Sequence, residues 1–310
     1  MIRASAPGKL VLMGEYAVLL GHPAVVAAVD VRAVCTRQGG LLSIDKDDGG
    51  LVDAVLAEAG LAEAGDVDGS IVVDTGAFRS GNEKYGLGSS AAACVALLRA
   101  LLPQIAVDEL HVRAQRAHRQ FQKGKGSGVD VCASVYGGVC SFVRKPDDVL
   151  EVDAVAPLPA AIALLPVWTG VSADTRVFLA RFSALAVERQ RHLVRPLAAA
   201  AYQFEEACDA DDALALLQAV ERAALQFEAL SEALGDALLV PAHYVAATIC
   251  SDFGGVAKPS GAGGGDVSLC FVPREAEASV RATLAANKLQ VLPFAVGGDV
   301  SGVDVVGDGA

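Results

Sequence analysis

The sequence predicts an α/β (α+β) protein of two domains, and three observations lead to that class. The chain has 310 residues, of which 53% are hydrophobic, enough for two cores rather than one. Valine-rich runs typical of strands alternate with alanine- and leucine-rich stretches typical of helices in both halves. A segment with several acids and two prolines, 147–160, separates the halves and predicts domains 1–155 and 156–310.

The predicted first domain begins with strands. Apolar runs punctuated by Gly, Pro and Asp predict strands at 9–19, 23–36 and 70–75. Two helical patterns follow at 89–102 and about 108–123, and Asp108 is the expected N-cap of the second. A glycine-rich break then leads into another apolar element at 129–143.

The predicted second domain opens with a buried strand at 161–170. Ala, Leu, Glu and Arg dominate from about 175 to 250, which favours several helices. Residues 254–273 run from a glycine-rich loop into a strand, and the tail holds a short helix and the run 290–298.

Charge and composition narrow the class of function. A formal net charge of -12 argues against a general binder of nucleic acid or anionic membranes, since both need a basic surface. No uncharged apolar run approaches the roughly 20 residues of a membrane span. The seven cysteines form no CxxC pair and are expected to be buried thiols in a reducing cytosol. We therefore expect a cytoplasmic protein, a monomer or homodimer, whose partner is a small molecule.

The stretch GLGSSAA, residues 86–92, is suited to hold an anion. Its glycines let the backbone approach a ligand, and the helix expected to begin near Ser89 offers free N–H groups and a positive dipole end. Phosphate is the natural ligand. The alternative is an ordinary serine-capped helix after a glycine turn.

Two other phosphate-binding motifs do not fit this stretch. A P-loop needs a lysine directly after its last glycine, and none is present. A dinucleotide fingerprint needs its glycines directly after a strand, whereas the run ending at Thr75 stops eleven residues before Gly86.

A second glycine-rich loop, KPSGAGGGD at 258–266, leads directly into an apolar strand. So many glycines cost backbone entropy on folding, and no packing requirement is visible in the sequence. We expect this loop to wrap around a ligand. The alternative is a flexible linker.

Two charged residues stand beside further turns. Lys9 begins the first predicted strand, in APGKLVLMGEYAV, and Asp130 follows a tight turn in GKGSGVDV. Taken singly, each is more often a solvated surface charge.

Together these stretches resemble the GHMP kinase superfamily, in the expected order over nearly the whole chain. The first, second and third motifs of that superfamily are matched by residues 6–30, 86–92 and 258–266. Within the superfamily the sequence is most similar to phosphomevalonate kinases. The stretches that carry this similarity are VVDTGAFRSGNEKYGLGSSAA, GSGVDVCASVYGG, WTGVSADT and the terminal Asp266 of the third motif.

Three positions depart from that pattern. His22 is more typical of mevalonate kinases, and Val129 stands where phosphomevalonate kinases often have Phe. Mevalonate kinases carry a metal-binding glutamate eleven residues before the catalytic aspartate, and Arg119 stands there in this chain. Mevalonate kinase is the alternative function, and a non-catalytic sensor with the GHMP fold is a more distant one.

The resemblance implies a two-domain GHMP kinase fold with nucleotide and acceptor in the cleft between the domains. ATP with Mg²⁺ would phosphorylate (R)-5-phosphomevalonate, giving 5-diphosphomevalonate and ADP in the mevalonate route to isoprenoids. The implied catalytic residues are Lys9, Ser90 and Asp130. The implied nucleotide-binding residues are Gly86, Leu87, Gly88, Ser89, Ser90 and Ala91, with Ser90 also a Mg²⁺ ligand. The implied acceptor-binding residues are Tyr16, Lys84, Lys125, Ser127, Ser260, Gly261 and Ala262.

The acceptor decides what the site needs. Mevalonate presents an alcohol that must lose a proton, whereas a phosphomonoester is already largely dianionic at pH 7. A phosphate acceptor therefore requires positive charge more than a base. Lys84 and Lys125 adjoin the motifs and are the expected sources of that charge.

Overall fold

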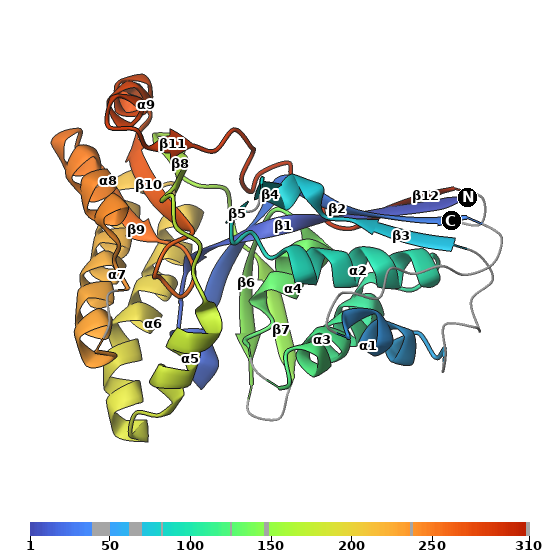
Figure 1. Cartoon of the computed structure of the whole chain (residues 1–310). Helices are drawn as coiled ribbons and strands as arrows, with labels where there is room; N and C mark the ends of the chain where they lie inside the picture. The colour runs from blue at the N-terminus through green and yellow to red at the C-terminus, as the bar shows by residue number, and fades with distance from the viewer. Residues whose placement is uncertain are drawn as a thin grey trace.

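The computed structural model describes residues 1–38, 50–61, 70–81, 83–124, 126–145, 149–235 and 238–307. Two antiparallel sheets lie side by side, each covered by its own helices (Figure 1). This mixed architecture confirms the predicted fold class.

The first sheet has the strand order β12-β1-β2-β6-β7, and β3 also pairs with β2. Its strands are β1 (Ile2–Met13), β2 (Ala24–Gln38), β3 (Ser70–Asp74), β6 (Val139–Arg144), β7 (Leu150–Ala154) and β12 (Asp304–Gly307). Helices α2 (Ser89–Leu101) and α4 (Val129–Tyr136) pack on β1 and β2, and α1 (Leu51–Glu58) and α3 (Val107–Phe121) pack on α2. A short ribbon, β4 (Arg79–Ser80) with β5 (Glu83–Lys84), precedes α2.

Helix α2 is buried nearly all round, as its alanine-rich sequence predicts. Small side chains let it lie close to the sheet, so its first turn is held beside β1. The helix predicted at 89–102 is thereby confirmed.

The second sheet has the strand order β11-β8-β10-β9. Its strands are β8 (Ile162–Trp168), β9 (Val256–Pro259), β10 (Val267–Pro273) and β11 (Gln290–Val291). The helices of this part are α5 (Thr175–Ser183), α6 (Val187–Asp209), α7 (Ala213–Ala233), α8 (Pro241–Asp252) and α9 (Glu277–Ala286).

Both faces of the second sheet are covered, because alternate residues of β10 enter different cores. Cys270 and Val272 pack with residues of α8 and α9. Phe271 faces the other way and makes an edge contact with Phe204 of α6, with ring centroids 6.0 Å apart. This packing holds the loop between β9 and β10 on a rigid base.

Two local expectations were wrong. Helix α3 begins at Val107 with Ala106 as its N-cap, so Asp108 lies in the first turn rather than at the cap. There its carboxylate accepts a hydrogen bond of 3.0 Å from the Tyr136 hydroxyl. The strand predicted at 9–19 ends at Met13, because Gly14 and Tyr16 have positive φ and turn the chain into the 3-10 helix η1 (Ala17–Leu20).

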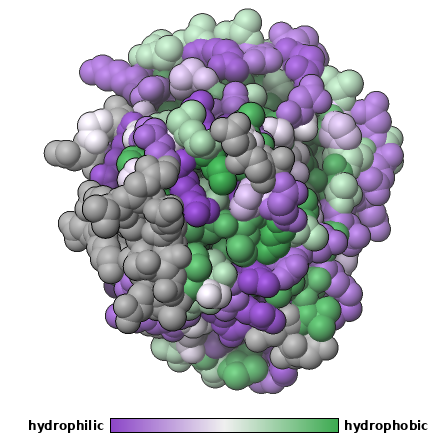
Figure 2. Space-filling view, turned by 90° about the vertical axis from the view of Figure 1, so that its right-hand side faces the viewer, coloured by the Kyte–Doolittle hydropathy of each residue, from purple (hydrophilic) through white to green (hydrophobic). Residues whose placement is uncertain are grey.

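The boundary proposed at 155/156 does not divide the sheets cleanly. Strand β12 belongs by sequence to the predicted second domain, yet it pairs with β1 in the first sheet. It covers an edge that β1 would otherwise leave open. Figure 2 looks onto this end of the molecule, where apolar patches lie among hydrophilic side chains. Val72 of β3 and Val306 of β12 are exposed.

All seven cysteines are buried and free, as predicted. Within the described ranges, no helix is both long and apolar enough to cross a membrane.

Candidate active site

The first turn of α2 lies open at the junction of the two sheets. Gly88 is its N-cap, in the left-handed conformation, and no side chain caps the helix. The first backbone N–H groups of a helix have no partner within it. The N–H groups of Ser89 and Ser90 are therefore available to an anion, as the sequence motif predicts.

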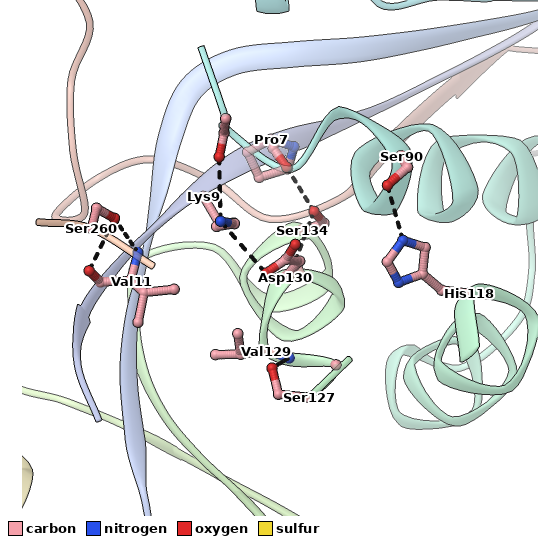
Figure 3. Close-up of polar contacts among 12 residues, drawn as sticks. Pro7, Lys9, Val11, Ser90, His118, Ser127, Val129, Asp130, Ser134 and Ser260 are labelled. Carbon is pink, nitrogen blue, oxygen red and sulfur yellow. Dashed lines mark hydrogen bonds and ion pairs between the residues drawn. The ribbon is translucent and has the colours of Figure 1, made fainter. Parts of the chain in front are cut away.

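Lys9 extends from β1 to this turn (Figure 3). Its ammonium donates a hydrogen bond of 3.3 Å to the Gly86 carbonyl, and its Nζ lies 3.7 Å from Oδ1 of Asp130. Lys9 is 11% exposed and Asp130 28% exposed, so this ion pair is only partly screened by water. A cation, a carboxylate and an uncapped helix end thus meet at one place.

The close approach of these groups depends on small residues. A Cβ atom on Gly88 would lie 3.0 Å from Cγ of Lys9. Asp130 is in the first turn of α4, and Ser134 joins that helix to β1 by donating a hydrogen bond of 2.8 Å to the Pro7 carbonyl. The positions of Lys9 and Asp130 relative to each other are therefore set by backbone packing.

Asp266, the last residue of the third motif, lies against the phosphate loop. Its carboxylate is so close to Gly86 that a Cβ there would stand 2.2 Å from Oδ2. Oδ1 accepts a hydrogen bond of 3.0 Å from the backbone N–H of Ala173. Burial raises the pKa of Asp266, while Lys9 and the hydrogen bonds oppose that shift. The sequence analysis used Asp266 only as a family marker and missed this position in the site.

The third loop is tied to β1 and to the turn that follows it by two hydroxyl groups. Ser260 Oγ accepts from the Val11 N–H at 3.0 Å and donates to the Val11 carbonyl at 3.1 Å. Tyr16 donates a hydrogen bond of 2.7 Å to the Ala262 carbonyl, and burial raises its pKa. Three of the four predicted acceptor contacts in this region, Tyr16, Ser260 and Ala262, thus serve to join the loops. Gly261 faces open space, since no atom of the part of the chain that the structure describes lies within 4 Å of a Cβ built there.

Packing does require most of the glycines in this loop, contrary to the expectation from the sequence. Cβ atoms on Gly263, Gly264 and Gly265 would lie 2.8, 2.2 and 2.4 Å from atoms of Leu238, Phe178 and Val171. The glycines allow the loop to settle onto neighbouring backbone and rings as well as to approach a ligand.

A buried ion pair fastens the same two segments more deeply. Lys258 donates hydrogen bonds to the carbonyls of Leu12 and Pro259 and pairs with Glu15 Oε1 at 2.5 Å. Burial lowers the pKa of Lys258, and the nearby Glu15 opposes that shift. Because both side chains are almost inaccessible, this pair holds the first and third motifs together without facing a ligand.

Ser90 lies in the first turn of α2, and its Oγ is 3.0 Å from Nε2 of His118 on α3 (Figure 3). Arg119, at the position of the family glutamate, is exposed on the same helix. The neighbouring histidine, and not the arginine, is therefore the residue of α3 that reaches Ser90. Sequence reasoning missed His118, although a helical periodicity that buries position 118 was visible.

Three predicted acceptor-binding residues, Lys84, Ser127 and Lys125, remain to be placed. Lys84 is exposed on β5 directly before the glycine turn, and its carbonyl accepts a hydrogen bond from Ser172. Ser127 Oγ accepts a bond of 3.4 Å from the Val129 N–H at the start of α4. Lys125 lies outside the described residues.

A separate cavity of about 300 Å³ opens between the sheets. Its lining includes Leu12, Ala27, Leu158, Leu164, Phe294 and Val296. None of the predicted site residues lines it, so it does not belong to the site around Lys9.

The similarity to known proteins includes the motifs described above. Residues 52–138 match the GHMP kinases N terminal domain, which includes α2 and Asp130. A crystal structure of Streptococcus pneumoniae phosphomevalonate kinase in complex with phosphomevalonate and AMPPNP shares the fold, with a TM-score of 0.82. The two sequences are 19% identical, and the superposed region covers 96% of this chain and 100% of the Streptococcus chain. The chain therefore resembles GHMP kinases in sequence over residues 52–138 and in fold over nearly its whole length, as the motifs predict.

Two curated relatives represent the two kinases weighed from the sequence. A phosphomevalonate kinase of Streptomyces sp. (strain CL190) is 26% identical over 341 residues, which span 89% of this chain and 91% of that protein. A mevalonate kinase of Archaeoglobus fulgidus is 31% identical over 160 residues, which span 46% of this chain and 53% of that protein. The similarity to the Streptomyces protein therefore extends along most of this chain, whereas the similarity to the Archaeoglobus protein covers less than half of it.

Proposed function

We propose that this protein is a phosphomevalonate kinase, which transfers the γ-phosphoryl group of ATP to the phosphate of (R)-5-phosphomevalonate. The observation that carries the proposal is the meeting of Lys9, Asp130 and the uncapped N-terminus of α2. Such a site can bind and neutralise a transferring phosphoryl group, which is most of what phosphoryl transfer requires. The near full-length similarity to the Streptomyces phosphomevalonate kinase supports the choice of acceptor.

The chain's own residues divide this work. The N–H groups at the start of α2 hold phosphate oxygens of the nucleotide. Lys9 neutralises charge on the transferring group, and Asp130 keeps the Lys9 ammonium in place at 3.7 Å. Since a phosphate acceptor is already dianionic near pH 7, Asp130 orients groups and need not remove a proton.

The oxygen donors of the site fit Mg²⁺. A serine hydroxyl and a carboxylate are hard donors, and Mg²⁺ is commonly held by one or two protein oxygens together with substrate phosphates. No cluster of three or more His, Cys, Asp or Glu side chains that could hold a metal ion occurs in the described part of the chain. Ser90 and Asp130 are the residues that would hold the ion, and bound Mg²⁺ would neutralise phosphate charge.

Lys84 is the proposed contact for the acceptor's phosphate. It is exposed directly before the glycine turn, while Tyr16 and Ser260 are already engaged within the protein. A charge-assisted contact in a partly desolvated site contributes about 1.5–3 kcal/mol. Lys84→Ala is therefore expected to raise KM for phosphomevalonate by between about 10-fold and about 150-fold.

The test is ADP release by the purified protein, followed with mevalonate and with phosphomevalonate in parallel. The wild type should prefer phosphomevalonate. Lys84→Ala should raise KM for that acceptor and leave any activity on mevalonate unchanged. Lys288→Ala, which removes an exposed lysine two residues beyond α9, is the matched control and should alter neither value. Equal loss on both acceptors with Lys84→Ala would reject the assignment.

Mevalonate kinase is the second candidate, favoured by the 31% identity to the Archaeoglobus enzyme and by the Asp130 carboxylate beside Lys9. Asp130→Asn separates the two. With a dianionic acceptor, part of the activity should survive at pH 8 and fall as the substrate protonates below about pH 6. An alcohol acceptor would lose its base, and activity would vanish at every pH.

A further inference from the structure

Helix α3 presents an unusual buried face to the two turns that form the site. His111, Gln115 and His118 follow one another at helical spacing, and each is less than 5% exposed. A polar side chain so deeply buried is costly unless it is hydrogen-bonded. The partners of these three residues therefore indicate what the face does.

Gln115 holds the turn in front of Asp130. Its Nε2 donates a hydrogen bond of 2.7 Å to the Gly128 carbonyl, and its Oε1 accepts one of 3.1 Å from Arg144. Gly128 is the N-cap of α4 and has φ 86°. A Cβ on Gly128 would lie 2.0 Å from Gln115 Oε1, so this contact requires glycine. Gln115 thereby supports the backbone from which Asp130 projects.

His118 lies one turn further along α3 and reaches the other turn of the site. Its Nε2 is 3.0 Å from Ser90 Oγ, and its ring also packs on Phe121 with centroids 6.0 Å apart. A neutral imidazole ring has one nitrogen that carries a proton and one that can accept a hydrogen bond.

We propose that His118 is a positioning residue for Ser90: its Nε2 accepts the Ser90 hydroxyl proton, which leaves the oxygen lone pairs of Ser90 available to a hard cation. The inference rests on the proposed function, since it concerns how Ser90 takes part in binding the metal-nucleotide. A Ser90 oriented in this way serves as a metal ligand and not as a hydrogen-bond donor to phosphate. Its contribution to nucleotide binding should therefore depend on Mg²⁺.

The experiment measures ADP binding by calorimetry, once with excess Mg²⁺ and once with a chelator, beside kcat and the melting temperature. His118→Phe keeps a ring of similar size and removes the acceptor. His118→Gln keeps an acceptor at the place of Nε2. We expect His118→Phe to weaken Mg²⁺-dependent ADP binding and lower kcat by about tenfold, with metal-free ADP binding unchanged. His118→Gln should restore most of both.

Two further variants separate positioning from general damage to the core. Ser90→Ala should have the same Mg²⁺-dependent effect, and Ser90→Ala with His118→Phe should be no worse than Ser90→Ala alone. His243→Phe removes an equally buried histidine on α8, whose Nδ1 accepts a hydrogen bond of 3.1 Å from the Val240 N–H. That control should lower the melting temperature and leave kcat unchanged.

The outcomes distinguish this inference from the proposed function. Losses that add in the double variant, equal loss of metal-free and Mg²⁺-dependent binding, or no rescue by His118→Gln would each overturn the role of His118. An unchanged Ser90→Ala protein would overturn it as well. If the wild type released ADP with neither acceptor, the proposed function would fail, while the binding measurements would still test His118.

Discussion

Replacing Gly86 by alanine puts a methyl group into the space that the Asp266 carboxylate occupies. The added Cβ would lie 2.2 Å from Oδ2, 2.3 Å from Cγ and 2.7 Å from Cβ of Asp266. All three distances are far inside van der Waals contact. Either the phosphate loop or the third loop must move.

The cost has two parts that can be measured separately. Gly86 has φ 71°, and an L-residue in that conformation loses about 1–2 kcal/mol. Forcing an extra carbon into a packed site adds about 1–3 kcal/mol. Gly60→Ala is the matched control, because Gly60 has φ 78° and no atom of the described residues lies within 4 Å of its added Cβ. That variant should show only the first cost in a urea titration.

Activity should respond more strongly than stability. The Gly86 carbonyl accepts the Lys9 hydrogen bond at 3.3 Å, so displacing the loop also displaces the cation. A misplacement of about 1 Å in an active site can cost about 100-fold in rate. We expect Gly86→Ala to lower kcat/KM by between about 10-fold and about 100-fold, with Gly60→Ala at the wild-type value.

Asp266→Gly supplies the background that can refute this reasoning. Asp266 has φ 53°, so glycine fits its backbone and removes the three atoms that lie nearest to the new methyl group. In that background Gly86→Ala should cost little further activity. If it lowered kcat/KM by the same factor in both backgrounds, the clash with Asp266 would not be the cause.

Three other predictions concern charge and pH. Lys9→Met should lower kcat by more than Ser90→Ala does, since it removes a full charge from the transferring group, and turnover near the wild-type rate would contradict the role of Lys9. Lys258→Met leaves Glu15 buried without its cation and should destabilise the protein by about 3–5 kcal/mol in a urea titration, whereas Glu15→Gln combined with Lys258→Met should recover part of that loss. Burial lowers the pKa of His243 to about 4 from the usual value near 6.5. Between these two pH values the unfolded chain binds a proton that the folded chain does not, so the free energy of unfolding decreases as the pH is lowered. His243→Phe should therefore lose about 2 kcal/mol less unfolding free energy than the wild type between pH 7.5 and pH 5, and equal losses would show that His243 is not the titrating group.

Much of the fold and part of the site could be predicted from local sequence. A glycine directly before a helix can adopt the left-handed conformation, in which other residues would be strained. Gly88 and Gly128 are the N-caps of α2 and α4 and have this conformation. The apolar run that follows Gly88 predicts a buried helix, and α2 is one. Motif order and spacing were enough to predict the similarity to GHMP kinases that the comparison finds over residues 52–138.

Two features of the fold could not be predicted from the sequence. The N-cap of α3 is Ala106 and not Asp108, because propensity marks a helix start only to within a residue or two. The pairing of β12 with β1 joins the two ends of the chain, and no periodicity records such a contact. A cut at 155/156 based on composition therefore assigns β12 away from the sheet it joins.

The sequence by itself determined the glycine turn before α2, the basic and acidic candidates Lys9 and Asp130, and the resemblance to GHMP kinases, because each depends on residues close together in the chain. Only the tertiary structure decided which distant side chains meet. Asp266 lies against Gly86, and His118 reaches Ser90, because packed sheets and helices bring together segments that no local pattern relates. The same packing explains why Tyr16 and Ser260 join loops and why Lys84 stays exposed for a ligand.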